Sequence, residues 1–96
     1  MTLRDQLKID EGIRTKMYRD IVGVYTAGVG RNLEAVAFSN DEIELMLTND
    51  INRALAACRA LFPMFDTFPQ AKQDALANMA FNLGRRRLSM FANMIA

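Results

Sequence analysis

Apolar residues recur at helical spacing through the middle of the chain, between Ser39 and Pro63. The positions that fall on one face of a helix are Ile43, Leu47, Ile51, Ala54, Cys58 and Leu61. The stretch Ser39–Glu42 has the form of a capping box, in which a Ser side chain and a Glu side chain three residues later satisfy each other's backbone amides. This pattern predicts a long helix over residues 39–62.

A second helical pattern follows after a short break. Thr67–Gln70 has the form of another capping box, with Pro69 in the first turn, where its missing N–H costs nothing. Gly84 supplies a stop signal. Leu88 to Ile95 is typical of the opening turns of a further helix, so the sequence predicts a partial helical lobe over residues 67–96.

The first part of the chain has a different pattern. Leu3 and Leu7, followed by Glu11 and Gly12, predict a short first helix that ends at the glycine. From residue 13 to 29, β-branched and aromatic residues alternate loosely with polar ones around a break at Asp20–Gly23, which predicts a β-hairpin. The expected fold class is therefore α+β and mostly α, with a small hairpin lobe over residues 13–38.

Length, composition and charge narrow the picture. A chain of 96 residues has room for one hydrophobic core, so we expect residues 1–96 to form a single domain. The net charge is +1, from 12 basic and 11 acidic residues, which gives no field that would attract nucleic acid. No apolar run is long enough to span a bilayer, and the first residues lack the apolar core of a signal peptide. We therefore expect that the chain is made in the cytoplasm and does not insert into a membrane.

The residue inventory also limits the chemistry. Histidine is absent and Cys58 is the single cysteine, which rules out an internal disulfide, the common zinc ligand sets and His-based nucleophilic triads. We therefore expect no metal and no cofactor, and interpret Cys58 as a core residue. Proton transfer is left to carboxylates.

Three polar residues suit the hydrolysis of a glycosidic bond, which needs a protonated carboxylic acid and a second carboxylate facing water or the sugar. Glu11 lies at the C-terminal end of the predicted helix, where the negative end of the macrodipole favours the protonated form. Asp20 lies at the hairpin bend, and Thr26 on the returning strand offers a hydroxyl that can hold a water. Taken singly, each also has a purely structural interpretation, as a solvated helix end, a turn former and a strand former.

Longer motifs around these residues resemble one known family. They are Ile9–Gly12, Tyr18–Asp20 and Tyr25–Leu33, followed by Ser39–Glu42 and Asn78–Gly84. In order and spacing they are similar to the phage-type lysozymes, glycoside hydrolase family 24. The resemblance implies a lysozyme-like fold and a muramidase that hydrolyses the β-1,4 bond between N-acetylmuramic acid and N-acetylglucosamine. It also implies that Glu11 is the acid, that Asp20 and Thr26 manage the attacking water, and that the reaction inverts the anomeric carbon.

The resemblance extends to substrate contacts. Asn32 and Phe81 match positions that line the sugar cleft in relatives. On a helical wheel Phe81 points away from Leu76, Met79, Ala80 and Leu83, as a cleft residue should. Burial on a second apolar face of the same helix is the alternative.

The chain also departs from the family pattern. Relatives continue with further helices that complete the larger lobe and carry an Arg that pairs with the catalytic Glu, so this chain looks truncated. Arg85–Arg87 stands where relatives have a small, Gly-rich loop, and we interpret it as a solvated surface rather than a contact to wall phosphates. Met94 stands where relatives often have a small polar cleft residue.

Without those helices, several apolar residues should lose their partners and form an exposed patch that favours self-association, domain swapping or binding of a separate chain that completes the lobe. They are Leu3, Leu7, Met79, Leu83, Met90, Phe91 and Ile95.

The main hypothesis is an endolysin-like muramidase whose partner is bacterial peptidoglycan, made in the host cytoplasm and acting on the wall after release. One alternative is a catalytically dead, truncated remnant that binds glycan or serves as a helical interaction module. Another is a toxin that attacks the walls of neighbouring cells and is held in check by an immunity partner.

Overall fold

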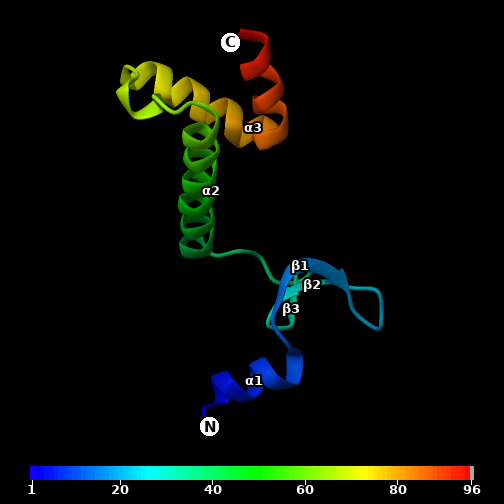
Figure 1. Cartoon of the computed structure of the whole chain (residues 1–96). Coiled ribbons are helices and arrows are strands. Elements are labelled where there is room, and N and C mark those ends of the chain that lie inside the picture. Colours follow the sequence, from blue (N-terminus) through cyan, green and yellow to red (C-terminus); the bar gives the residue numbers. More distant parts are fainter. Residues whose placement is uncertain (96) are drawn as a thin grey trace. The chain divides into compact units, whose positions relative to one another are not determined.

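The computed structural model describes residues 1–95, except for the side chains of Phe91, Met94 and Ile95 (Figure 1). The predictions made for those three side chains therefore lie outside the described residues. Along the chain the elements are α1 (Leu3–Glu11), β1 (Arg14–Arg19), β2 (Tyr25–Gly28), β3 (Arg31–Asn32), α2 (Asn40–Leu61), the 3-10 helix η1 (Phe65–Thr67) and α3 (Gln70–Ile95). The predicted α+β, mostly helical fold class is confirmed. The elements form two compact units, one of residues Met1–Ser39 and one that begins at Asn40.

Helix α1 is held by its two caps. Its N-cap Thr2 and Asp5 form a capping box, in which the Thr2 hydroxyl accepts from the Asp5 amide at 3.1 Å. At the other end Gly12, with φ 75°, donates its N–H to the Lys8 carbonyl at 3.0 Å. Because no residue of α1 is buried, these caps are a main source of stability for the helix. The predicted short helix ending at Gly12 is confirmed.

The strands form one antiparallel sheet in the order β1-β2-β3, so the predicted hairpin is confirmed. The paired residues are Arg14 with Gly28, Tyr18 with Thr26 and Arg19 with Tyr25, with an irregularity in register between the first two pairs. On its other edge β2 pairs with β3 through Thr26–Asn32 and Ala27–Arg31. The sequence did not predict β3, because two residues are too few to show a period of two.

The second unit is built on the long helix α2, whose bounds differ by one residue at each end from the predicted range 39–62. Only its C-terminal half is well covered: Ala54, Ala57 and Cys58 are buried. Ile43, Leu47 and Ile51, on the same predicted face, stay 46%, 40% and 43% exposed. The apolar face was therefore predicted correctly, but among the described residues its N-terminal half is only partly covered.

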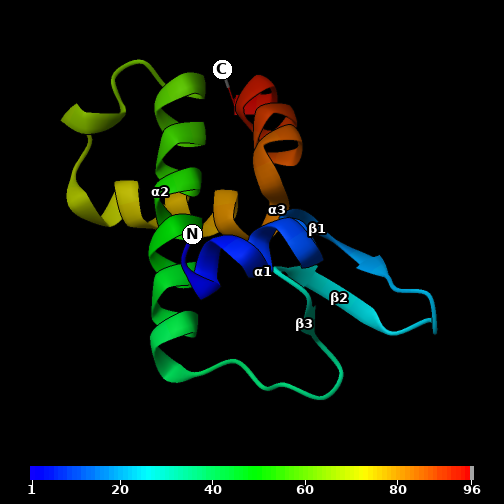
Figure 2. The same cartoon turned by 90° about the horizontal axis from the view of Figure 1, so that it is seen from below.

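The core of the second unit lies where α2 packs against α3 (Figure 2). Its fully buried side chains are Phe65, Leu88 and Cys58, which confirms the interpretation of Cys58 as a core residue. Phe65 belongs to η1 and meets the Phe68 ring edge-on at 6.2 Å between centroids. The sequence did not predict η1, so it missed Phe65 as a core residue.

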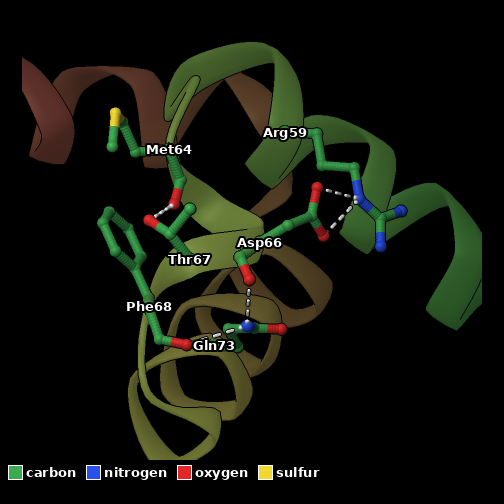
Figure 3. A network of polar contacts seen from close by, with 6 residues as sticks. All are labelled: Arg59, Met64, Asp66, Thr67, Phe68 and Gln73. Atoms are coloured by element: carbon green, nitrogen blue, oxygen red, sulfur yellow. Dashed lines mark hydrogen bonds and ion pairs between the residues drawn. The ribbon is translucent and has the colours of Figure 1, made fainter.

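A network of polar contacts fixes the connection between α2 and α3 (Figure 3). Arg59 Nε donates to both carboxylate oxygens of Asp66, at 3.1 and 3.3 Å. Gln73 Nε2 donates to the backbone carbonyls of Asp66, at 3.3 Å, and Phe68, at 2.9 Å. The Thr67 hydroxyl donates to the Met64 carbonyl at 2.6 Å.

This network shows that the capping box predicted at Thr67 is wrong. The Thr67 hydroxyl is bonded within the η1 turn, and the Gln70 side chain donates to Asp74 at 2.7 Å instead of reaching back. Phe68 is extended, with φ −69° and ψ 152°, and α3 starts at Gln70 after Pro69.

Helix α3 contains a sharp bend at Gly84, where φ is 77° and ψ is 164° (Figure 1). The predicted stop at Gly84 and the helix after it are both confirmed. The loop expected over Arg85–Arg87 is wrong, because the turn is made by the glycine alone and helical structure resumes at Arg85. The three arginines therefore form the first turn of the second segment of α3.

The predicted exposure of apolar residues is confirmed for Leu3, Leu7, Leu83 and Met90, which are 75%, 42%, 40% and 62% exposed. It is wrong for Met79, which is half-buried against the core of the second unit. Among the described residues, no helix combines the length and the hydropathy needed to cross a bilayer.

Candidate active site

The first unit carries four of the five predicted site residues, and Glu11 is the first of them. It is the last residue of α1, directly before the cap at Gly12, and its side chain is exposed. Its carboxyl group packs against Gly30, at the turn between β2 and β3. A Cβ atom at Gly30 would lie 2.9 Å from Glu11 Oε2 and 3.0 Å from Cδ, so any other residue there would have to displace the carboxyl group.

Asp20 occupies the hairpin bend, as predicted, and one of its oxygens organises that bend. Oδ1 accepts from the Val22 amide at 3.0 Å and from the Val24 amide at 2.8 Å. The Asp20 amide in turn donates to the Val24 carbonyl at 3.0 Å. Oδ2 makes no hydrogen bond with any described residue. The carboxylate is thus held in a fixed orientation and keeps one oxygen for another partner.

Thr26 lies on the central strand β2 and is only 5% exposed. Its hydroxyl donates to the Val24 carbonyl at 2.9 Å. Because the proton is used in this bond, the lone pairs on Oγ1 can only accept from a further partner. Thr26 was predicted to hold a water, and in this structure its hydroxyl can do so only as an acceptor.

Val24 joins the two predicted water-handling residues. Its amide binds the Asp20 carboxylate, while its carbonyl receives the Thr26 hydroxyl. The side chains of Asp20 and Thr26 are therefore held by one short piece of backbone. The sequence could not predict this link, because Val24 contributes only main-chain atoms to it.

Asn32, predicted to contact substrate, pairs directly with Thr26 across the sheet. Its amide oxygen accepts from the backbone amides of Glu34, at 2.9 Å, and Ala35, at 3.0 Å. This bonding is that of an Asx turn, so the side-chain oxygen is already occupied. The two hydrogens on Nδ2 are the part of Asn32 that can meet a ligand.

Two residues that support this site were missed by the sequence analysis. Gly30 lies within the motif Tyr25–Leu33, whose pattern does not predict that this glycine makes room for Glu11. Glu34 Oε2 accepts from the Tyr25 amide at 2.7 Å and ties the segment after β3 to β2. A glutamate in a polar loop carries no sequence signal for such a contact.

Phe81 belongs to the second unit, on α3, and is 46% exposed. This exposure agrees with its predicted outward direction and contradicts the alternative of a second buried face. The ring lines two hollows of that unit, of about 490 and 310 Å³. Its contact with sugar stays a prediction.

Burial has a clear effect on one ionisable group of the described chain. Loss of solvent around Cys58 raises the pKa of its thiol, and the nearby Arg59 charge only partly opposes this. A thiol in that state is a poor nucleophile, which agrees with a packing role. Among the described residues no three His, Cys, Asp or Glu side chains gather as a metal site would require.

Two comparisons with known proteins both point to the phage lysozymes. The family model for phage lysozyme matches residues 8–94, a span that includes all five predicted site residues. A curated relative, the probable T4-type lysozyme 2 of Dictyostelium discoideum, is 27% identical over an alignment covering 94% of this chain and 70% of that protein. Since the family match covers most of the chain, including every motif on which the resemblance was based, the chain belongs to the phage lysozyme family.

Proposed function

We propose that the chain is an endolysin-like muramidase, which hydrolyses the β-1,4 bond between N-acetylmuramic acid and N-acetylglucosamine in peptidoglycan. In this proposal it is made in the host cytoplasm and acts on the bacterial wall after release. Membership of a family of lysozymes supports the reaction class. The arrangement of Glu11, Asp20 and Thr26 supports the division of roles.

Glu11 acts as the general acid in this proposal. Its protonated carboxyl group gives a proton to the glycosidic oxygen, which leaves with the N-acetylglucosamine residue as its 4-hydroxyl group. The carboxyl group is exposed and therefore accessible to a glycan, and it lies against Gly30. The position of this group matters because proton transfer requires the acid to lie within hydrogen-bond reach of the leaving oxygen.

Asp20 and Thr26 handle the water. The unoccupied Oδ2 of Asp20 takes a proton from water as the water oxygen attacks the anomeric carbon. Thr26 Oγ1, whose own proton is bonded to the Val24 carbonyl, accepts the other water hydrogen. Attack on the face opposite to the leaving group inverts the anomeric carbon, so a β-linked substrate gives an α-configured product.

The observation that carries this proposal is the shared anchor at Val24. It fixes one acceptor from Asp20 and one from Thr26, and a water molecule has two hydrogens to donate. Such fixed orientation is what reduces the entropic cost of bringing water to the reacting carbon.

Product analysis tests the proposal. Purified peptidoglycan is digested with the chain, and the new reducing ends are identified by mass spectrometry after borohydride reduction. The expected ends are N-acetylmuramic acid, and proton NMR during the first turnovers should show the α anomer before mutarotation. New ends that consist of N-acetylglucosamine, or no new reducing ends at all, would contradict the proposal.

A further inference from the structure

The turn between β1 and β2 exposes two aliphatic side chains that the proposed reaction does not use. Ile21 is 105% exposed and Val22 is 81% exposed. Figure 2 shows this turn at the tip of the hairpin, away from α1. Turns are dominated by Gly, Pro, Asn, Asp and Ser, so two adjacent aliphatic residues at this place are unusual. Their contact with water is unfavourable, and burial in an apolar medium would remove it.

The backbone of the turn is bonded from within. The amides of Val22 and Val24 donate to Asp20 Oδ1 at 3.0 and 2.8 Å, and the Gly23 amide donates to the Asp20 carbonyl at 3.0 Å. A backbone amide without a partner is costly to move out of water. Because these three amides already have partners, the tip can enter a less polar medium without losing their hydrogen bonds.

Behind the tip, basic and aromatic side chains lie on the two strands. The Arg19 guanidinium carbon lies 4.6 Å from the centroid of the Tyr25 ring, and Arg19 NH2 donates to the Tyr25 hydroxyl at 2.5 Å. Lys16 lies further back on β1 and is exposed. Side chains with an apolar stem and a polar end gather where an apolar phase meets water, and Tyr, Arg and Lys are typical of that boundary. The hairpin thus changes from apolar at its tip to basic and amphipathic behind it.

The charge of the hairpin is complementary to an anionic surface. Residues 13–32 contain four basic residues and a single acidic one, Asp20, although the whole chain has a net charge of only +1. Asp20 Oδ1 accepts two amide hydrogens, which stabilise its charge locally. Basic residues within about 10 Å of an anionic surface are attracted to it in spite of screening by salt. The binding partner of this surface should therefore combine negative charge with an apolar phase.

The shape of the tip decides between a bilayer and a second copy of the chain. A stable contact between proteins buries about 1,200–2,000 Å² on surfaces that fit each other. A projecting tip of two side chains offers little such area, whereas a bilayer deforms around the tip and needs no matching surface. A soluble polyanion would meet the basic residues but leave Ile21 and Val22 in water. The observations together favour a lipid bilayer with anionic head groups.

We propose that the hairpin tip binds anionic lipid bilayers as a peripheral contact. Ile21 and Val22 enter the boundary between head groups and acyl chains, while Arg19 and Lys16 stay beside the phosphates. No segment crosses the bilayer in this arrangement. The contact needs neither a glycan nor a proton donor, so it is independent of the proposed reaction.

Binding to vesicles tests the proposal. Vesicles of equal parts phosphatidylglycerol and phosphatidylcholine should bind the chain in a flotation assay, and vesicles of phosphatidylcholine alone should bind it at least about tenfold more weakly. The double variant Ile21→Gln, Val22→Gln should also bind the anionic vesicles at least about tenfold more weakly. Leu45→Gln with Met64→Gln is the matched control. It removes two side chains of the second unit, each 63% exposed, and should change binding by less than about twofold.

The contribution of charge is measured with single variants in the same assay. Arg19→Gln and Lys16→Gln should each weaken binding about fivefold, since a basic residue near an anionic membrane contributes about 1 kcal/mol. Arg86→Gln removes the same charge from α3 and should change binding by less than about twofold.

Fluorescence reports the depth of the tip. The chain contains no tryptophan, so Val22→Trp introduces a single probe at the tip and Leu45→Trp a single probe on α2. With anionic vesicles, the emission of the tip probe should shift to shorter wavelength and be quenched by brominated acyl chains. The emission of the α2 probe should do neither.

Any of four results would overturn the proposal: no binding to anionic vesicles, equal binding to neutral ones, equal loss in the tip variant and its matched control, or an unshifted tip probe. Unchanged vesicle binding by the tip variant, with a smaller species in light scattering, would assign the tip to a second copy of the chain instead. Since vesicles contain no glycan, the same assay with a Glu11→Gln chain separates failure of this contact from failure of the proposed reaction.

Discussion

At the scale of single residues, the contact between Gly30 and Glu11 offers a sharp test of the site. Gly30→Ala would place a methyl group where the Glu11 carboxyl group lies. Displacement of a reacting group by about 1 Å can cost about a hundredfold in rate. We expect lytic activity to fall by about that factor, measured as turbidity loss of permeabilised cells.

Gly28→Ala is the matched control for this substitution. Gly28 and Gly30 share φ 65°, so an alanine at either position costs about 1–2 kcal/mol of backbone strain. A Cβ atom at Gly28 meets nothing within 4 Å. Urea unfolding should show similar destabilisation of both variants, with activity lost in Gly30→Ala alone. Equal loss of activity in the two variants would mean that strain, rather than Glu11, explains the effect.

Cys58 gives a prediction about pH. Because the folded state raises the pKa of the thiol, the unfolded chain begins to lose this proton first, near the ordinary value of 9.0. The unfolded state then binds fewer protons than the folded state, so the free energy of unfolding falls as pH rises. The contribution is complete below pH 9.0 and is lost between that pH and the raised pKa of the folded thiol.

Urea unfolding at pH 8 and pH 10, compared between the native chain and Cys58→Ala, isolates this contribution from other titrating groups. The variant should be less stable at pH 8 by about 1–2 kcal/mol from lost packing, and the difference should shrink at pH 10. A difference that stays constant or grows would show that the thiol ionises at least as readily in the folded chain as in the unfolded one.

The sequence identified the polar residues of the candidate site but not the contacts that hold them in place. Glu11, Asp20 and Thr26 belong to spaced motifs, and their types fit carboxylate chemistry. The link through Val24 is made by main-chain atoms, and the role of Gly30 depends on a neighbour nineteen positions earlier in the chain. Asn32 was predicted for its side chain, yet the turn after β3 uses its oxygen. Such competition for one atom becomes visible only in three dimensions.

At the scale of elements, capping signals predicted helix ends well where they acted alone. Gly12 and Gly84 end helical segments, and α2 starts next to Ser39. The error at Thr67 arose where tertiary packing competes with local capping, since Phe65 of the same turn is fully buried. Elements of two or three residues, β3 and η1, are too short for any periodic signal.

The connection between α2 and α3 should depend more on Gln73 than on the ion pair beside it. Gln73 is half-buried and bonds two backbone carbonyls, so Gln73→Ala leaves Asp66 and Phe68 without these partners. We expect a loss of about 1–2 kcal/mol in the free energy of unfolding. Arg59 and Asp66 are 52% and 65% exposed, and such pairs contribute about 0–1 kcal/mol.

Urea unfolding of Gln73→Ala and Asp66→Asn makes this comparison directly. Asp66→Asn removes the charge of the pair but keeps the backbone carbonyl that Gln73 binds. A larger loss in Asp66→Asn than in Gln73→Ala would contradict the assignment.

At the scale of the whole molecule, the exposed apolar residues predict self-association. Ile43, Leu47 and Ile51 line the N-terminal half of α2, and Leu83 and Met90 are exposed on α3. Large apolar groups left in water favour contact with another copy of the chain. We expect light scattering to report a dimer or larger species, with Leu47→Lys and Met90→Lys shifting it towards the monomer. A monodisperse monomer across the micromolar range would contradict this prediction.

The fold class and the family followed from the sequence because helical periodicity, capping residues and spaced motifs extend over nearly the entire chain. The extent of burial did not follow, because periodicity identifies an apolar face without saying what covers it. Ile43 and Ala54 share one predicted face of α2, yet Ala54 is 5% exposed and Ile43 is 46% exposed. Only the part of the face that meets α3 and η1 becomes core.

The most direct test of the central claim is the lytic activity of Glu11→Gln on permeabilised Gram-negative cells, beside the native chain and Asp10→Asn. Asp10 is the neighbouring carboxylate of α1 and bonds the Gln6 side chain at 2.8 Å, so its variant removes the same charge from the same helix end. Glutamine cannot deliver a proton, and loss of general acid catalysis typically costs about 10²–10⁴-fold in rate. We expect lysis by the native chain and by Asp10→Asn, with at least a hundredfold loss in Glu11→Gln on this scale. Equal lysis by the native chain and Glu11→Gln would contradict the role of Glu11 as general acid.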